Sequence, residues 1–163
     1  MDTNQGYPDG YAVTVSWIDG AWNVAKFRDD FTHFSTAVDA VRNLRSEGAA
    51  FALLCVEDEY LVIVRPGPNR VHALISDATM AVDDDYAAEV LDELGIEIPD
   101  LDPDELDEID GWADGDFGIL DNVGLSEELL SVLVDDQDAY PSDIIQRIAD
   151  ELDFSDELER VLR

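Results

Sequence analysis

Two apolar runs at the centre of the chain dominate its hydrophobic pattern. Residues 49–56 and 60–64 are almost continuously apolar, and they flank the acidic triplet Glu57 to Glu59. A strand of that composition is usually covered on both faces of its sheet. The pattern therefore predicts a hairpin in the middle of a sheet, with the acidic triplet in its turn.

The N-terminal part of the chain predicts a second hairpin. Residues 11–18 and 21–28 alternate between apolar and polar positions on either side of Asp19-Gly20, a strong hairpin signal. Trp17 and Trp22 flank this turn. We expect the two indole rings to pack against each other across the strands.

One more strand and two helical segments follow from the same kind of pattern. Residues 70–76 alternate after a Pro-Gly turn cluster, which predicts a fifth strand. Apolar residues recur at helical spacing after Ser35, a candidate N-cap. A second helical pattern begins after Asp77, a further candidate N-cap, and ends at Gly95. The three aspartates at 83–85 leave two interpretations open, namely two helices or one helix with a distorted middle.

An acidic stretch separates these elements from the end of the chain. Residues 96–115 contain nine acidic residues and two prolines with few apolar anchors, so we expect an extended or weakly ordered linker. After it, apolar residues at helical spacing form stripes that favour a small internal bundle. The predicted helices span residues 117–122, 126–134, 141–152 and 155–162.

Together these elements predict an α+β fold. We expect a five-stranded, mainly antiparallel sheet in the order ββαβββα, followed by an acidic linker and a small C-terminal helical bundle. The corresponding division is a sheet domain at residues 1–95, a linker at 96–115 and a helical subdomain at 116–163.

Negative charge is concentrated in the second half of the chain. Forty acidic residues against nine basic ones give a net charge of −31. Residues 1–76 carry ten acidic and six basic residues, whereas residues 77–163 carry thirty and three, so the net charges are −4 and −27. Such a surface repels nucleic acids and anionic membranes and attracts cationic partners. Adaptation for solubility is the competing explanation of the charge.

Candidate chemistry is sparse. Cys55 is the single cysteine and lies within an apolar run, where a thiol usually packs as a small hydrophobic group. His33 and His72 have no partners at metal-ligand spacing, so we predict neither a metal nor a cofactor. The start of the chain does not resemble a signal peptide, and no apolar run is long enough to span a membrane. These features predict a cytoplasmic protein.

Several segments of the second half are specific enough to indicate a family. They are Asp77-Ala78, the acidic stretch up to Asp114, residues 125–136 (LSEELLSVLVDD), Ala139-Tyr140-Pro141 and residues 153–162 (DFSDELERVL). In these segments the chain resembles the actinobacterial tRNA adenosine deaminase-associated proteins, and the likeness extends from the first hairpin to the end. The resemblance implies association with a tRNA adenosine deaminase, and it supplies no catalytic residues. The chain also lacks the His-x-Glu and Pro-Cys-x-x-Cys motifs of the zinc deaminases themselves.

The leading hypothesis is a non-enzymatic accessory or regulatory protein that binds a basic protein partner, with a tRNA adenosine deaminase as the candidate. The alternative is a nucleic-acid mimic that inhibits a DNA- or RNA-binding protein, and an enzyme with paired carboxylates is a third hypothesis. We expect no direct binding of nucleic acid or membranes. The residues proposed to contact the partner are Asp104, Glu105, Asp107, Glu108, Asp110, Trp112, Phe117 and Tyr140. For Tyr140, which precedes Pro141, packing at the start of a helix is the favoured alternative.

Overall fold

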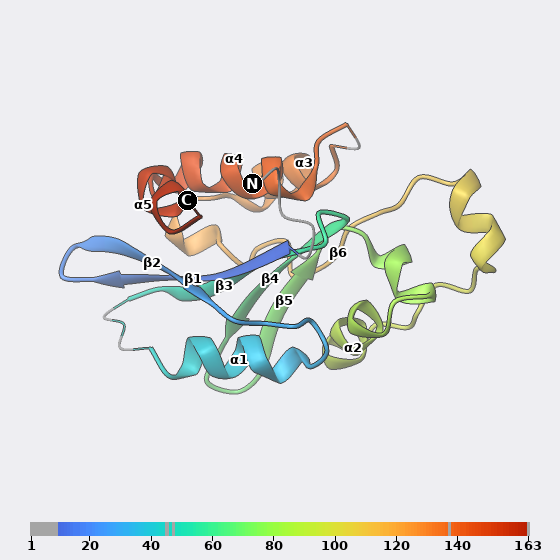
Figure 1. Ribbon diagram of the computed structural model, residues 1–163, viewed down its shortest axis with the longest axis horizontal. Coiled ribbons are helices and arrows are strands. Elements are labelled where there is room, and N and C mark those ends of the chain that lie inside the picture. Colours follow the sequence, from blue (N-terminus) through green and yellow to red (C-terminus); the bar gives the residue numbers. More distant parts are fainter. Residues whose placement is uncertain (1–9, 45, 47, 137, 163) are drawn as a thin grey trace, which may run out of the picture.

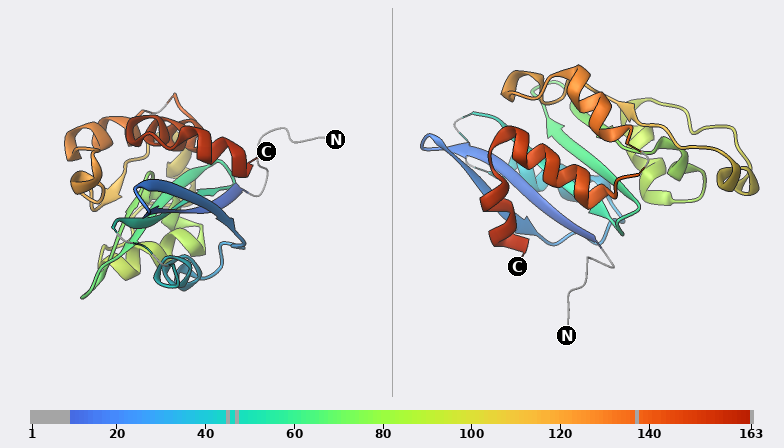
Figure 2. Two further views of the ribbon diagram at one scale, coloured as in Figure 1. Left: turned by 90° about the vertical axis from the view of Figure 1, so that its left-hand side faces the viewer. Right: turned by 90° about the horizontal axis from the view of Figure 1, so that it is seen from above.

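An antiparallel sheet lies at the centre of the protein, with helices on both of its faces (Figures 1 and 2). The computed structural model describes residues 10–44, 46, 48–136 and 138–162. In this part of the chain the sheet has six strands in the order β2-β1-β3-β4-β5-β6. Their bounds are Gly10–Ile18 for β1, Ala21–Phe27 for β2, Ala50–Val56 for β3, Tyr60–Pro66 for β4, Val71–Ile75 for β5 and Asp114–Gly115 for β6.

The five predicted strands are present, and a sixth strand that the sequence did not indicate is added at one edge. β6 consists of two residues, which pair with Leu74 and Ile75 of β5. Gly115 has φ 118°, and a Cβ atom there would collide with the carbonyl oxygen of Ala73, so this close approach requires glycine. The prediction of five strands was therefore wrong by one, because a strand of two residues leaves no alternating pattern.

Two helices and a short 3₁₀ helix cover one face of the sheet. They are α1 (Phe34–Arg42), η1 (Ala78–Val82) and α2 (Asp85–Leu94), so the helical pattern after Asp77 resolves into two helices. Asp77 caps η1 as predicted, since its side chain accepts a hydrogen bond from the Thr79 N–H at 3.0 Å. Ser35 is not the N-cap of α1; the cap position is His33, and Glu89 of α2 accepts a hydrogen bond from the Phe34 N–H at 2.6 Å.

The C-terminal helices cover the opposite face (Figure 2). They are α3 (Glu127–Val134), α4 (Pro141–Leu152) and α5 (Ser155–Leu162), preceded by the 3₁₀ helix η3 (Asp121–Val123). Their apolar residues join Leu53, Leu61 and Ile63 of the sheet in one hydrophobic cluster. The expectation of a bundle packed mainly on itself was therefore wrong, because the shared apolar stripe is buried against the sheet.

Aromatic residues connect these helices to the first hairpin. The rings of Trp17 and Trp22 lie opposite each other across the strands, with centroids 5.0 Å apart, which confirms the predicted packing. Trp22 also contacts Phe154, and its indole N–H donates a hydrogen bond to the Leu152 carbonyl oxygen at 2.9 Å. The end of α4 is thereby fixed to the edge of the sheet.

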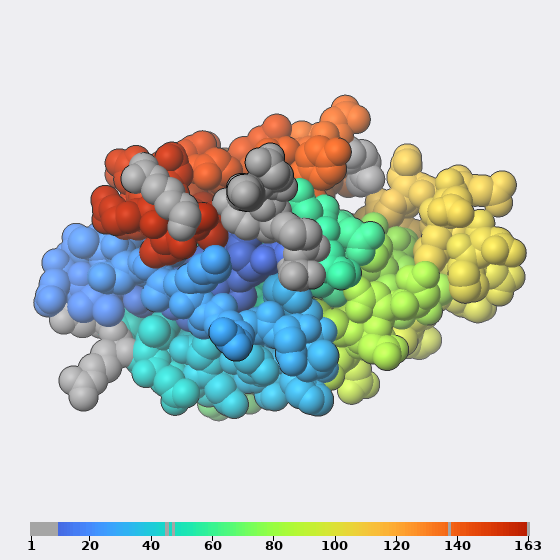
Figure 3. Space-filling model, viewed as in Figure 1, coloured from blue at the N-terminus to red at the C-terminus, as the bar shows by residue number. Residues whose placement is uncertain are grey.

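The acidic stretch leaves the body of the protein between α2 and β6. It contains the 3₁₀ helix η2 (Pro103–Glu108), which projects beside η1 and α2 and is seen as the yellow segment in Figure 3. The proposed division at residues 95 and 116 stays a prediction, and its outer ends at residues 1–9 and 163 lie outside the described residues. Within the described part of the chain, no helix is long and apolar enough to cross a membrane.

Candidate functional site

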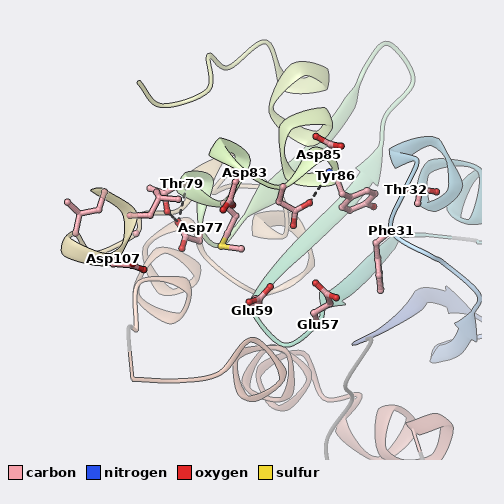
Figure 4. A pocket seen from close by; sticks show the side chains of 15 residues that line it. Phe31, Thr32, Glu57, Glu59, Asp77, Thr79, Asp83, Asp85, Tyr86 and Asp107 are labelled. Atoms are coloured by element: carbon pink, nitrogen blue, oxygen red, sulfur yellow. Dashed lines mark hydrogen bonds between the residues drawn. The ribbon is translucent and has the colours of Figure 1, made fainter. Parts of the chain in front are cut away.

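Acidic turns gather at one end of the sheet. The β3–β4 turn contains Glu57, Asp58 and Glu59, and the chain that leaves β5 brings Asp77 to the same end. Antiparallel pairing causes this juxtaposition, because a turn after β3 and the end of β5 must lie at the same side of the sheet. The η1–α2 junction then adds Asp83, Asp84 and Asp85 (Figure 4).

The β3–β4 turn has an unusual backbone that is held in place by Asp58. Glu57 and Asp58 have φ values of 55° and 53°, in the left-handed region that few residues other than glycine adopt. The Asp58 carboxylate accepts hydrogen bonds from the Ser142 N–H at 2.9 Å and from the Cys55 thiol at 3.4 Å. These contacts fix the turn against α4 and leave Glu57 and Glu59 to line a cavity.

The cavity has a volume of about 770 Å³ and an acidic lining. Seven of its lining residues are carboxylates, and no lysine or arginine is found among the described lining residues. The seven are Glu57, Glu59, Asp77, Asp83, Asp84, Asp85 and Asp107. A neighbouring cavity of about 470 Å³ shares Phe31, Glu57 and Asp84 with it and adds Asp29 and Asp30. The two hollows form a single acidic region, which we call the acidic end.

The carboxylates at the acidic end repel one another. Burial raises the pKa of Glu59, and the charges of Glu57, Asp84 and Asp83 raise it further. Burial also raises the pKa of Asp29, although the hydrogen bond from the Phe31 N–H opposes this effect. The pKa of Asp30 is lowered instead, chiefly by the hydrogen bond from the Thr32 hydroxyl. Within the described chain none of the carboxylates that line the two cavities forms an ion pair with lysine or arginine.

Two buried polar atoms at the acidic end have no hydrogen-bond partner among the described residues. They are the hydroxyl oxygen of Tyr86 and the Oδ2 atom of Asp29. Tyr86 is 3% exposed, and burial followed by the charges of Asp29, Glu89 and Asp84 raises the pKa of its phenol. Buried polar atoms usually have partners, and each unpaired one costs about 1–3 kcal/mol.

The acidic stretch contributes to the same region, and only part of the predicted contact set lines the cavity. Leu106, Asp107 and Ile109 reach it from η2 and the residues that follow. Gly111 lies so close to the Asp77 carboxylate that any side chain at 111 would collide with it. The Ala78 N–H donates a hydrogen bond to the Trp112 carbonyl oxygen at 2.7 Å, which fixes the returning chain.

The other predicted contact residues lie at varied positions. Four acidic residues are exposed and do not line the cavity, namely Asp104, Glu105, Glu108 and Asp110. Trp112 is 41% exposed beside them. Phe117 is half-buried and packs against the C-terminal core. Tyr140 is 65% exposed, so the favoured expectation that it packs at the start of α4 was wrong.

Sequence reasoning missed most of the residues that line the cavity. The acidic triplet at 57–59 was assigned to a hairpin turn and the triplet at 83–85 to a distortion within a helical pattern, and neither Asp29 nor Tyr86 was singled out as a site residue. One signal could have found the triplets, because both follow strands or helices that the antiparallel topology brings to one end of the sheet. Nothing in the sequence indicates that the Tyr86 hydroxyl lacks a partner.

A second polar cluster, at the opposite end of β4 and β5, has a structural role. Arg65 donates hydrogen bonds to the Ile119 carbonyl oxygen at 2.8 Å and to Asn122 at 2.7 Å. His72 lies 2.7 Å from the Asp116 carboxylate. These contacts attach the chain after β6 to the sheet. Within the described residues no group of three or more His, Cys, Asp or Glu side chains is arranged to hold a metal ion.

Comparison with known proteins agrees with the resemblance seen in the sequence. A family model described as "Rv3753c-like tRNA adenosine deaminase-associated protein" matches residues 10–155. Protein Rv3753c of the actinobacterium Mycobacterium tuberculosis is 44% identical over 156 residues, which cover 95% of this chain and 88% of the relative. No solved structure matches the chain. The chain therefore belongs to the Rv3753c-like tRNA adenosine deaminase-associated protein family.

Proposed function

We propose that this protein is a non-enzymatic accessory protein whose acidic end binds a basic surface of a tRNA adenosine deaminase. The family description supplies the candidate partner. One observation carries the choice of surface: seven carboxylates converge on one cavity without a basic residue among the described residues that line it.

The electrostatics of the acidic end favour a cationic protein partner. Burial raises the pKa of Glu59 and the charges of Glu57, Asp84 and Asp83 raise it further, and each cationic side chain that approaches the cavity offsets the part that comes from these charges. An enzyme that acts on tRNA needs a cationic surface to bind the phosphate backbone, so it offers the complementary charge. Complementarity of this kind contributes mainly specificity and a fast association rate.

The projecting segment extends this surface. The exposed acidic residues of η2 and its flanks, which include Asp104, Glu105 and Glu108, lie next to the cavity that Asp107 lines. Trp112, which is partly exposed after this segment, offers an apolar contact beside the charges. Partner binding by these residues is part of the proposal, together with Asp110 and, at the start of α4, Tyr140.

A nucleic-acid mimic has less support from the arrangement of charge. Such a mimic presents carboxylates at the regular spacing of phosphates, whereas the carboxylates here converge on one hollow from separate segments of the chain. The proposal that the protein is not an enzyme rests on the family description, which names association with a deaminase, and on the absence of the deaminase motifs from the sequence.

Calorimetry with the tRNA adenosine deaminase of the same organism tests the proposal. We expect binding at low salt, weaker binding at physiological salt because exposed charges are screened, and competition by tRNA for the same cationic surface. The test variant carries Glu57→Gln, Glu59→Gln and Asp83→Asn. The control removes the same charge from exposed positions of α4 and α5 with Glu151→Gln, Asp156→Asn and Glu159→Gln.

The comparison of the two triple variants separates local recognition from general charge. We expect the test variant to bind at least about tenfold more weakly than the control, a difference of about 1.4 kcal/mol. Equal affinities would show that the acidic end is not the contact surface. No binding of the wild-type protein at low salt would contradict the function itself.

A further inference from the structure

We propose that the acidic end contains a subsite that accepts one arginine side chain of the protein partner, between Asp29, Asp84 and the ring of Tyr86. This inference rests on the proposed function and deepens it. It commits the surface to a polypeptide partner and names the group that this partner inserts.

Unused acceptor capacity is the first observation. Asp29 uses Oδ1 to accept a hydrogen bond from the Phe31 N–H at 2.8 Å, while its Oδ2 atom is buried without a partner. Asp84 caps α2 through its Oδ1 atom, which accepts from the Tyr86 N–H at 3.0 Å. Both carboxylates line the smaller cavity, so their negative charge faces the same space.

The Tyr86 hydroxyl is a second and independent observation. Tyr86 is 3% exposed, lines the larger cavity and lies beside Phe31 and Thr32 in Figure 4. Its oxygen atom has no hydrogen-bond partner among the described residues. A buried hydroxyl without a partner is costly unless a ligand supplies one. A donor from the partner protein would satisfy it.

The geometry favours a guanidinium group over other cations. A guanidinium has five N–H donors in one plane and can serve several acceptors at once. Asp84 lines both cavities, Asp29 lines the smaller one and Tyr86 the larger one, so a guanidinium beside Asp84 lies between the other two acceptors. Phe31 lines both cavities and makes an edge contact with Tyr86, with ring centroids 5.9 Å apart, so an aromatic side chain borders both hollows. A guanidinium can stack on an aromatic ring, whereas an ammonium group is a more strongly hydrated point charge.

The residues do not fit a metal ion. Metal binding would need three or more carboxylate, imidazole or thiolate groups around one point, and no such group occurs among the described residues. The carboxylates are spread around the wall of a hollow of about 470 Å³, which has room for a long side chain.

Partner binding by single variants of the full-length chain tests the subsite. Asp29→Asn keeps the oxygen that accepts from the Phe31 N–H and removes the charge, and Tyr86→Phe removes only the hydroxyl. Asp39→Asn is the control, because it removes the same charge from an exposed position of α1 that lines neither cavity. We expect Asp29→Asn to weaken deaminase binding at least about tenfold and Asp39→Asn by less than about twofold. Equal effects of the two variants would overturn the subsite while leaving the proposed function in place.

A second measurement does not depend on the deaminase. N-acetyl-argininamide and its uncharged citrulline isostere are titrated into the ¹⁵N-labelled wild-type protein, with N-acetyl-lysinamide as a third probe. We expect saturable shifts of the Phe31 and Tyr86 amide signals with the arginine compound and none with citrulline. Equal responses to arginine and lysine, or no response to arginine, would overturn the assignment. If the deaminase fails to bind the wild-type protein, the proposed function fails and this titration still decides the subsite.

Discussion

Replacement of Phe154 by alanine tests whether the sheet and the C-terminal helices unfold as one unit. Phe154 follows α4 and is fully buried, and its ring contacts Trp22 and Phe51 with centroid distances of 6.0 and 6.3 Å. Trp22 belongs to β2 and Phe51 to β3, so a single side chain joins the two parts that the sequence divides at residue 116.

The expected loss follows from the burial of this ring. A Phe→Ala change in a core costs about 3–5 kcal/mol, because it removes apolar contacts and leaves a cavity. Two edge-to-face aromatic contacts are lost as well, so we expect a value in the upper half of that range. Domains of this size have a total stability of about 5–15 kcal/mol, and the loss is therefore a large fraction of it. Val132→Ala on α3 is the control, because Val132 is 67% exposed and should change stability by less than about 0.5 kcal/mol.

Urea unfolding followed by two signals provides the assay. Tryptophan fluorescence reports on Trp17 and Trp22 in the sheet once Trp112 of the acidic stretch is replaced by phenylalanine, and far-ultraviolet circular dichroism reports mainly on the helices. We expect the two curves of Phe154→Ala to coincide and to shift to lower urea together. A helical transition that moves while the fluorescence transition stays in place would refute the single unit and support an independent helical subdomain. A loss below about 1 kcal/mol would refute the packing argument.

Three other predictions concern the acidic end and the core beside it. Gly111→Ala should release the returning acidic stretch from Asp77, because the new methyl group collides with the Asp77 carboxylate. We expect faster amide hydrogen exchange at residues 109–112 with little change in melting temperature. Burial raises the pKa of the Cys55 thiol to about 12, so alkylation by iodoacetamide at pH 8 should proceed only as fast as the protein unfolds, and rapid labelling of the native protein would contradict this. Folding raises the pKa of Glu59 above its ordinary value of 4.5 and that of Asp29 above 3.8, so these two carboxyl groups bind protons more tightly in the folded state than in the unfolded state. Protonation therefore stabilises the folded state, and the melting temperature should rise as the pH falls from 7 towards 5. Glu59→Gln should reduce that rise, and a flat or falling profile in this window would contradict the proposed repulsion.

The strands and turns could be predicted because their signals are local. Asp19-Gly20 fixes the first hairpin, and continuous apolar runs identify β3 and β4 as the covered centre of the sheet. The N-cap Asp77 was equally visible, and its carboxylate accepts a hydrogen bond from the Thr79 N–H two residues along the chain at 3.0 Å. In each case the residues that determine the structure are neighbours in the chain.

Features that depend on distant residues could not be predicted in this way. The start of α1 is satisfied by Glu89, which is 55 residues away from Phe34, so no nearby capping residue marks it. The stripe on α4 and α5 shows that a face is buried but does not say against which surface, and both a bundle and a sheet satisfy it. The strand β6 depends on a close backbone approach at Gly115, which has no hydrophobic signature.

The contact residues proposed from the sequence stay a prediction, whereas the position of the acidic cavity could not be predicted. The sequence placed an acidic contact surface at residues 104–110, where carboxylates are dense, with Trp112, Phe117 and Tyr140 as apolar contacts. The cavity instead combines four separate segments, to which that stretch contributes Asp107. The density of acidic residues along a chain shows where charge is abundant. A site depends on which carboxylates lie close together in space, and that cannot be predicted without the order of the strands in the sheet.

The same distinction separates a binding role from mere solubility. Charge that serves solubility works best on exposed positions, where each carboxylate is fully hydrated and its pKa stays near its ordinary value. Asp29 departs from that pattern, because partial burial and the charge of Asp30 raise its pKa against the opposing hydrogen bond from the Phe31 N–H. That placement reduces the stability of the folded protein, and the unpaired Tyr86 hydroxyl reduces it again. A cationic side chain at the acidic end would compensate both costs together, which a dispersed acidic surface would neither incur nor need.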